Sequence, residues 1–348
     1  LYSVIALGIM VNFDLRHSRS LVRVICFVGS VVAGTSLYQF FFEPSLGGLL
    51  RSPHWIPGFE LVRVRAGSAM GASPIVTGAY LALIVPLGLA LLACEPSRLA
   101  RWFHALQVGL MVVALAVTFS RSAWVQLAVS FALLAALLVL PEKWQAARIP
   151  IAGLVCLTVA LVAVGFVVCT GSVESPSHPW LVAGNQVRVL RWYTSLSASD
   201  VEQLLVGYGP GVTWPMFASG QAEFGMVLRR LEQLTPGVSS TESFALMLFL
   251  DLGILGLLTF FAQLWVWIRS TLGAQPGAYG RGKTWPLSWA LASALAGAMV
   301  SALVSITLAS WQVAALMWTY AGLSSVCAGH RDSLLQVHRT VAVRQGSF

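Results

Sequence analysis

Residues 74–94 read PIVTGAYLALIVPLGLALLAC and contain no charged side chain. An α-helix needs about 20 consecutive apolar residues to cross the hydrocarbon core of a bilayer. In lipid the backbone must satisfy its own hydrogen bonds, and one apolar run can do so only as a helix. This stretch therefore predicts a transmembrane helix and indicates the class of the whole protein.

The rest of the chain repeats this pattern. Of its 348 residues, 57% are hydrophobic and 10% are charged, whereas a soluble domain carries roughly 25% charged residues. We expect an all-α, polytopic transmembrane bundle with about nine spans. The candidate spans are residues 1–13 (partial), 24–42, 74–94, 102–118, 122–140, 149–169, 243–268, 286–304 and 308–328.

The first apolar run is too short to span a membrane. The chain begins at Leu1 rather than Met, without a preceding basic segment or a following small-residue cleavage site. We therefore do not interpret the run as a signal peptide. We expect a chain that lacks one or more earlier spans.

Basic residues in the loops set the expected orientation. One alternating set of loops holds thirteen of the 21 lysines and arginines, and an excess of these residues is typical of the cytoplasmic side. We therefore expect a bacterial cytoplasmic (inner) membrane protein whose active face is periplasmic. The thirteen residues are Arg16, Arg19, Arg23, Arg98, Arg101, Lys143, Arg148, Arg269, Arg281, Lys283, Arg331, Arg339 and Arg344.

Four regions follow from this topology. Residues 1–169 hold the first six spans, 170–241 form a large periplasmic loop, 242–328 hold the last three spans, and 329–348 form a cytoplasmic tail. Long loops in compact proteins are usually functional or disordered. Aromatic residues and Gly/Pro turns favour a folded loop here, and apolar residues at helical spacing around Phe224–Leu234 predict an amphipathic helix.

Two arginine motifs are expected on the outer side. Thr118-Phe119-Ser120-Arg121-Ser122 forms a very tight hairpin between two spans, and its guanidinium suits a lipid phosphate. Arg188 and Arg191 stand three apart, so a helix would present both to a diphosphate. The alternatives remain open: an interfacial Arg and Trp pair that fixes the helix ends, and a solvated face of a loop helix.

Two further motifs lie in the large loop and at the start of the seventh span. Glycines in Gly207-Tyr208-Gly209-Pro210-Gly211 permit close approach to a ligand, although a plain turn is the simpler interpretation. Ser239 and Glu242 have the spacing of a capping box, which the spacing alone favours over an acid–base role for Glu242. Asp251 lies about two turns into the span and should face the bundle interior with a partner.

Other kinds of site find little support. No pair of the six histidines has metal-ligand spacing, and no dinucleotide or phosphate-binding loop follows a strand. The net charge of +8 is spread over short loops, so we expect no nucleic-acid partner. We therefore expect no metal and no cofactor, and membrane lipid as a partner.

Taken in order, these motifs resemble the O-antigen ligase and O-antigen polymerase superfamily over residues 60–328. The resemblance rests on Arg65-Ala-Gly67 to Ser73-Pro74, on Phe119 to Ala123, on Arg188 to Trp192, on Gly207 to Gly211 and on Glu242-Ser243 to Gly256. Ligases of the family carry a His-Asn pair where this chain has Glu242-Ser243, and Glu is compatible with a polymerase-type member. Ser73-Pro74 also departs from an asparagine-containing pattern.

The resemblance implies a periplasmic glycosyltransferase for surface polysaccharide, O-antigen or exopolysaccharide. Its donor would be a glycan on undecaprenyl diphosphate, and its acceptor a hydroxyl of another glycan, of lipid A-core or of a protein. Arg121, Arg188 and Arg191, with Arg65 and the glycines Gly207, Gly209 and Gly211, would bind the diphosphate. Glu242 would be the base, supported by Tyr208 and Asp251, in a metal-independent, inverting transfer.

Two other classes of function stay open. A membrane transporter or a flippase of lipid-linked glycans would place ionisable residues near the midplane of the bilayer, often on broken helices. A non-catalytic membrane scaffold would not need its arginines. Alanine at Arg121, Arg188 and Arg191 together would then leave the glycan phenotype intact.

Overall fold

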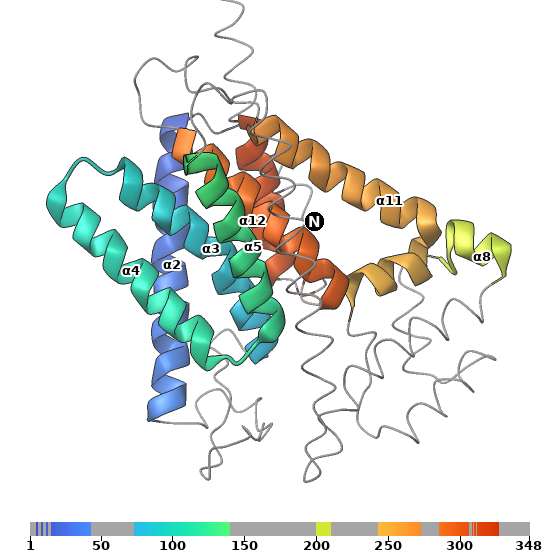
Figure 1. Ribbon diagram of the computed structural model, residues 1–348, viewed down its shortest axis with the longest axis horizontal. Coiled ribbons are helices and arrows are strands. Elements are labelled where there is room, and N and C mark those ends of the chain that lie inside the picture. The colour runs from blue at the N-terminus through green and yellow to red at the C-terminus, as the bar shows by residue number, and fades with distance from the viewer. Residues whose placement is uncertain are drawn as a thin grey trace, which may run out of the picture.

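The protein is all-helical wherever the computed structural model describes it (Figure 1). The described residues are 5, 8, 9, 12, 15–42, 73–139, 200–209, 243–272, 285–305, 308, 310 and 312–326, and none of them forms a strand. The labelled helices are α2 (Leu15–Phe41), α3 (Pro74–Cys94), α4 (Arg98–Val117), α5 (Arg121–Val139), α8 (Val201–Val206), α11 (Phe244–Leu272) and α12 (Trp285–Val304). A further helix covers residues 312–326.

Several of these helices can span a membrane. Four are long and apolar enough by length and composition: His17–Phe41 within α2, Pro74–Cys94, Arg98–Val117 and Phe244–Leu272. Arg121–Leu137 and Leu287–Leu303 are shorter apolar helices. This set is that of a multi-pass membrane protein. Run 149–169 and most of run 1–13 lie outside the described residues, so the count of nine spans stays a prediction.

The apolar runs predict the positions of the helices well, and local sequence explains the ends. Helix α3 coincides with predicted span 74–94, because Ser73 caps its first turn and Pro74 needs no backbone donor there. Helix α2 begins at Leu15, about two and a half turns before predicted span 24–42. Its first turns carry arginines, so the helix extends beyond its apolar stretch.

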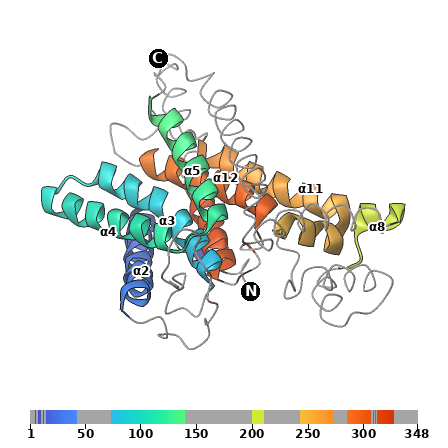
Figure 2. The ribbon, with the colours of Figure 1, turned by 60° about the horizontal axis from the view of Figure 1, so that its bottom comes forward.

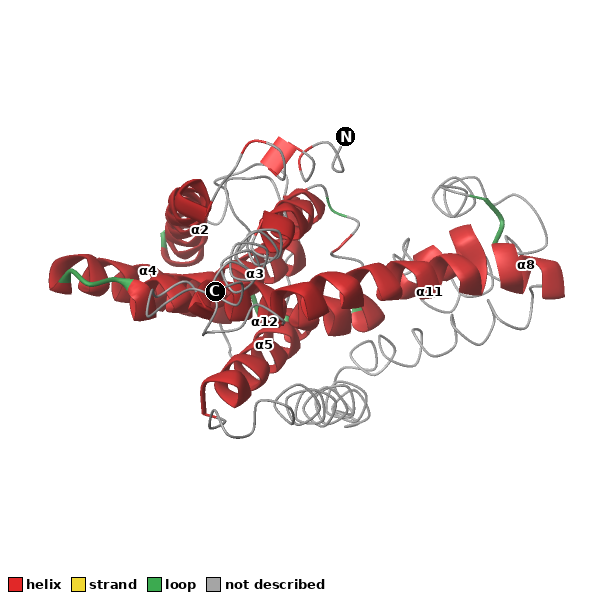
Figure 3. Cartoon of the chain, turned by 90° about the horizontal axis from the view of Figure 1, so that it is seen from above, coloured by secondary structure: helices red, strands yellow, loops and turns green. Residues whose placement is uncertain are grey.

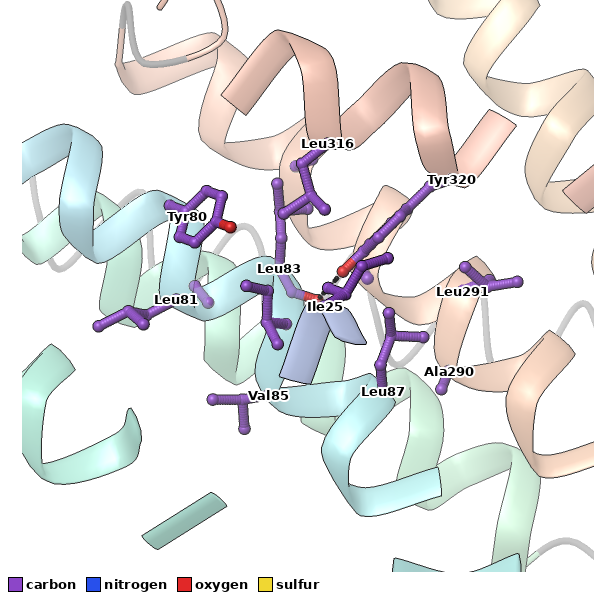
Figure 4. Close-up of a cluster of buried hydrophobic side chains, with 14 of the residues drawn as sticks. Ile25, Tyr80, Leu81, Leu83, Val85, Leu87, Ala290, Leu291, Leu316 and Tyr320 are labelled. Atoms are coloured by element: carbon purple, nitrogen blue, oxygen red, sulfur yellow. Dashed lines mark hydrogen bonds between the residues drawn. The ribbon is translucent and has the colours of Figure 1, made fainter. Parts of the chain in front are cut away.

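Helix α3 forms the centre of the bundle. It packs against α2, α4, α5 and α12, and a helix that is apolar on all sides is typical of such a position. Pro86 interrupts the hydrogen-bond ladder of α3, and one turn away the Tyr320 hydroxyl donates to the Leu83 carbonyl at 3.0 Å (Figure 4). A side chain from the end of the sequence therefore closes the middle of the core.

The helices alternate in direction and give the bundle two distinct ends. Arg23 of α2 pairs with Glu95, which follows α3, at 2.9 Å, and Arg101 of α4 donates to the Glu95 carbonyl at 3.0 Å. We call this the basic end. We call the opposite end the hairpin end. There the ring of Phe40, in α2, lies 6.4 Å from the ring of Phe119, which is in the turn that joins α4 to α5.

Helix α12 joins the second half of the chain to this bundle. It runs antiparallel to α5, and at Gly297 a Cβ would meet the backbone of Gln126, so no larger residue fits that crossing. The helix ends at Val304, and a separate helix covers 312–326. The two runs are therefore two helices rather than one long bent helix. The views in Figures 2 and 3 show α12 beside α5 and α3.

Candidate functional site

The Arg121 hairpin is as short as the sequence predicts. Helix α4 ends at Val117 and α5 begins at Arg121, leaving three residues for the reversal. Side chains satisfy the turn: the Thr118 hydroxyl donates to the Leu115 carbonyl at 2.7 Å and accepts from the Ser120 amide at 3.3 Å. Phe119 adopts φ 51°, a left-handed conformation uncommon for a bulky residue.

Helix α3 holds this hairpin from behind. At Gly78 a Cβ would lie 2.9 Å from the Thr118 hydroxyl oxygen and 3.0 Å from the Ser120 Cβ. Thr118 and Ser120 are buried, whereas Arg121 is exposed. The guanidinium therefore projects from a rigid turn at the hairpin end, on the first residue of an apolar helix.

The second feature is a break in helix α11. Gly253 has φ 66° and ψ −169°, a combination open almost only to glycine. Figure 1 shows the consequence, because the two limbs of α11 meet at an angle beside α8. The limb after the break has about 19 residues, or about 28 Å, and is long enough to span a bilayer. The sequence predicts one span over 243–268, whereas the structure divides it after about two and a half turns.

A segment of the predicted large loop fills this break. The amide of Tyr208 donates to the Leu250 carbonyl at 2.8 Å, and the amide of Gly209 donates to the Asp251 carbonyl at 3.0 Å. These donors occupy carbonyls that the following turn of a continuous helix would otherwise use. Helix α8, just before, supplies Leu204 to an apolar cluster around Leu246, Phe249 and Leu250.

Glycines on both partners make the contact possible. At Gly207, with φ 77°, a Cβ would lie 2.5 Å from the Asp251 carbonyl. At Gly253 a Cβ would collide with the backbone carbonyl of Leu205. The motif Gly207-Tyr208-Gly209 is thus more than the plain turn that its sequence suggests, because it interlocks with Asp251 to Gly253.

Asp251 is buried, as its depth in the span predicts, with 8% of its surface exposed. The neighbouring Leu246, Phe249 and Leu250 form a cluster of their own with Leu204 and Tyr208, separate from the main core around α3. The acid therefore lies where a loop segment covers a helix break.

The start of α11 is attached to the end of α12. The Ser243 hydroxyl accepts from the Leu246 amide at 3.3 Å and lies 3.0 Å from the Leu303 carbonyl, to which it can donate. The Phe244 amide donates to the Ser305 carbonyl at 3.1 Å. The Ser243 hydroxyl therefore caps the first turn of α11, whereas Ser239 and Glu242 of the predicted capping box lie outside the described residues. Because α12 is antiparallel to α5, this junction lies at the hairpin end.

The structure brings together part of the predicted site. Gly207, Tyr208, Gly209 and Asp251 form one interlocked unit, and Arg121 lies on a separate turn at the hairpin end. Five predicted residues lie outside the described residues, as does the predicted amphipathic helix: Arg65, Arg188, Arg191, Gly211 and Glu242. Sequence reasoning missed the roles of Ser243 and Gly253. The glycine inside the apolar run is only a weak signal of a break, because a helix tolerates an isolated glycine.

The described residues also show where the charged side chains lie. Within them no group of three His, Cys, Asp or Glu side chains is arranged to hold a metal ion. The arginines separate by end: Arg23, Arg98 and Arg101 lie at the basic end, and Arg121 lies at the hairpin end. What the hairpin end can offer a ligand is a fixed cation beside buried hydroxyls.

Neither a model of a known protein family nor any curated protein matches this chain.

Proposed function

We propose that the chain is a multi-pass protein of the bacterial cytoplasmic membrane, with about nine spans and the loop 170–241 on the periplasmic side. We propose further that it transfers a glycan from undecaprenyl diphosphate to a sugar hydroxyl, as O-antigen polymerases and ligases do. Glu242-Ser243 in place of a His-Asn pair favours the polymerase type.

The interlock between Gly207–Gly209 and Asp251–Gly253 carries this proposal. A long loop that only connects two spans has no need to replace helical hydrogen bonds with its own amides. Here two amides of loop 170–241 occupy carbonyls of a membrane-capable helix, at 2.8 and 3.0 Å. A loop fixed in this way can cover a reaction at the membrane surface and position its own residues there.

The proposed transfer is a single displacement. The acceptor hydroxyl oxygen forms a bond to the anomeric carbon, while the bond from that carbon to the diphosphate oxygen breaks and its electron pair leaves with the diphosphate. The hydroxyl proton passes to the Glu242 carboxylate. Attack opposite the leaving group inverts the anomeric configuration.

Negative charge that develops on the diphosphate needs fixed cations. Guanidinium groups bind phosphate oxygens in a planar, two-pronged manner, and they act strongly in a partly dry site. Arg121 suits this task because its hairpin is held by side-chain hydrogen bonds and by α3. Arg188 and Arg191, with Arg65, would complete the diphosphate site.

Reconstitution tests the proposal directly. Protein in nanodiscs receives an undecaprenyl-diphosphate-linked glycan with or without lipid A-core, and gels and mass spectrometry follow the products. Longer lipid-linked chains without added acceptor identify a polymerase, and product only with lipid A-core identifies a ligase. We expect Arg121→Gln to lower the rate about 100-fold, the scale of removing one donor from a charge-stabilising site.

Arg269→Gln is the matched control, because Arg269 is also an exposed arginine on an apolar helix but lies in the last turn of α11, toward the basic end. Its rate should equal that of the wild type. Equal rates for both variants would show that Arg121 only fixes the helix end at the interface.

The helix break also favours a second candidate, a transporter or a flippase of lipid-linked glycans. Transporters bind their substrates at discontinuous helices, and α11 is discontinuous beside the buried Asp251. A fluorescent lipid-linked glycan in sealed vesicles separates the two activities. Flipping without any glycan product would replace the transferase with the flippase.

A further inference from the structure

An apolar groove runs along the outside of the bundle between α2 and α4. It has a volume of ≈ 490 Å³ and is lined by Leu37 of α2 and by Trp102, Ala105, Leu106, Gly109 and Val113 of α4. Figures 1 and 2 show α4 at the edge of the molecule, on the opposite side from α8.

The sequence of α4 makes this groove. Ala105 and Gly109 form a low floor between larger side chains, and at Gly109 a Cβ would meet no described atom within 4 Å. Trp102 is 67% exposed and Leu106 is 70% exposed. An apolar surface of this kind needs an apolar occupant.

Two arginines of α4 lie at one end of the groove. Arg98 lies one helical turn before Trp102 on the same face of α4, and Arg101 lies one turn before Ala105. Both arginines are exposed. The nearby carboxylate of Glu95 is paired with Arg23 at 2.9 Å. The mouth of the groove therefore keeps an excess of positive charge.

The length of the groove matches one leaflet. From Trp102 to Val113 the helix rises about 16 Å, and half of the hydrocarbon core measures about 15 Å. An acyl chain whose headgroup lies at the basic end would therefore follow the groove to about the middle of the bilayer.

We propose that this groove is a binding site for one anionic phospholipid, with its phosphate at Arg98 and Arg101 and one acyl chain over Ala105 and Gly109. Basic residues at the membrane surface attract anionic lipid, and the groove adds a fixed place for the chain. The site is distinct from the proposed glycan transfer and does not depend on it.

Native mass spectrometry of the full chain in detergent tests the site with two probes, phosphatidylglycerol and phosphatidylcholine. We expect the wild type to retain one phosphatidylglycerol molecule about ten-fold more tightly than phosphatidylcholine. Arg98→Gln should remove most of this preference, because it weakens binding of the anionic phosphatidylglycerol more than binding of the zwitterionic phosphatidylcholine. Gly109→Leu, which fills the groove, should weaken retention of both lipids.

Two controls match these variants. Arg269→Gln removes an exposed arginine outside the groove, and Gly34→Leu adds the same side chain at a glycine of α2 that also has open space around it and does not line the groove. Both should bind lipid like the wild type. Equal retention of the two lipids by the wild type, or unchanged retention by Gly109→Leu, would overturn the site. A change in oligomeric state with Gly109→Leu would instead identify a protein occupant.

Discussion

Two departures from helical backbone, at Phe119 and at Gly253, are built in opposite ways. Both residues have a positive φ, 51° and 66°. At the hairpin the polar groups are satisfied by neighbours in sequence, with Thr118 bonded to Leu115 and Ser120. At the break the backbone carbonyls accept from the amides of Tyr208 and Gly209, which are more than 40 residues away in the sequence.

This difference separates a local structure from an assembled one. A hairpin that closes on its own side chains forms whenever its two helices pair. The break in α11 depends on the loop segment. Without it, the carbonyls of Leu250 and Asp251 would lose the amides of Tyr208 and Gly209 as donors in an apolar region. The break therefore couples the loop to the membrane helix, and the hairpin does not.

The largest expected effect is at Gly253. Gly253→Ala forces a Cβ onto the Leu205 carbonyl at a φ that side chains rarely adopt, so we expect a loss of about 3 kcal/mol in unfolding free energy. Thermal unfolding in detergent measures the loss. Limited proteolysis should also show faster cleavage between residues 200 and 209, because the loop segment would leave the break.

Gly34→Ala is the matched control for this substitution. Gly34 is a helical glycine of α2 at which a Cβ meets no described atom within 4 Å. Its stability should stay the same or rise by up to about 1 kcal/mol, the helix propensity of alanine over glycine. If Gly253→Ala is as stable as Gly34→Ala, then the interlock is not a strong contact.

The sequence predicts the helices because their signal is local. The run 74–94 coincides with α3, since apolar length, the Ser73 cap and Pro74 all act within one segment. The tight turn at Arg121 is predicted for the same reason, because two apolar runs leave only a few residues between them. The all-helical, membrane-capable class therefore follows from composition and run length.

The interlock could not be predicted because its cause is not local. The motif Gly207-Tyr208-Gly209 is compatible with any turn, and Gly253 in an apolar run is compatible with an ordinary helix. Only their contact explains both. The cap of α11 is similar, because Ser243 caps the helix while it contacts the Leu303 carbonyl at the end of α12, which is distant in the sequence.

The next largest effect is expected at the hairpin, where the contacts are local. Thr118→Val keeps the shape of the side chain but removes a fully buried hydroxyl and its hydrogen bonds to Leu115 and Ser120, so we expect a loss of about 1–2 kcal/mol. Proteolysis between residues 200 and 209 should not change. Faster cleavage there would show that the hairpin and the interlock are one cooperative unit.

Thr259→Val provides the control for Thr118→Val. The Thr259 hydroxyl donates to the Leu255 carbonyl at 2.7 Å within a single exposed turn of α11. Because valine leaves that helix intact, the change should stay within about 0.5 kcal/mol. A similar loss at both sites would mean that the effect belongs to threonine in apolar helices and not to the turn.

The smallest expected effect is at Tyr320, where a distant residue again completes a helix but does so with a side chain. Tyr320→Phe removes the hydrogen bond to Leu83 and leaves the ring packed, so we expect a loss of about 0.6–1 kcal/mol. Tyr38→Phe, at a half-exposed position of α2, should cost nothing measurable. Thermal unfolding of both variants gives the comparison. A loss at Tyr320 as large as that at Gly253 would show that the core contact beside Pro86 is as strong a non-local contact as the interlock.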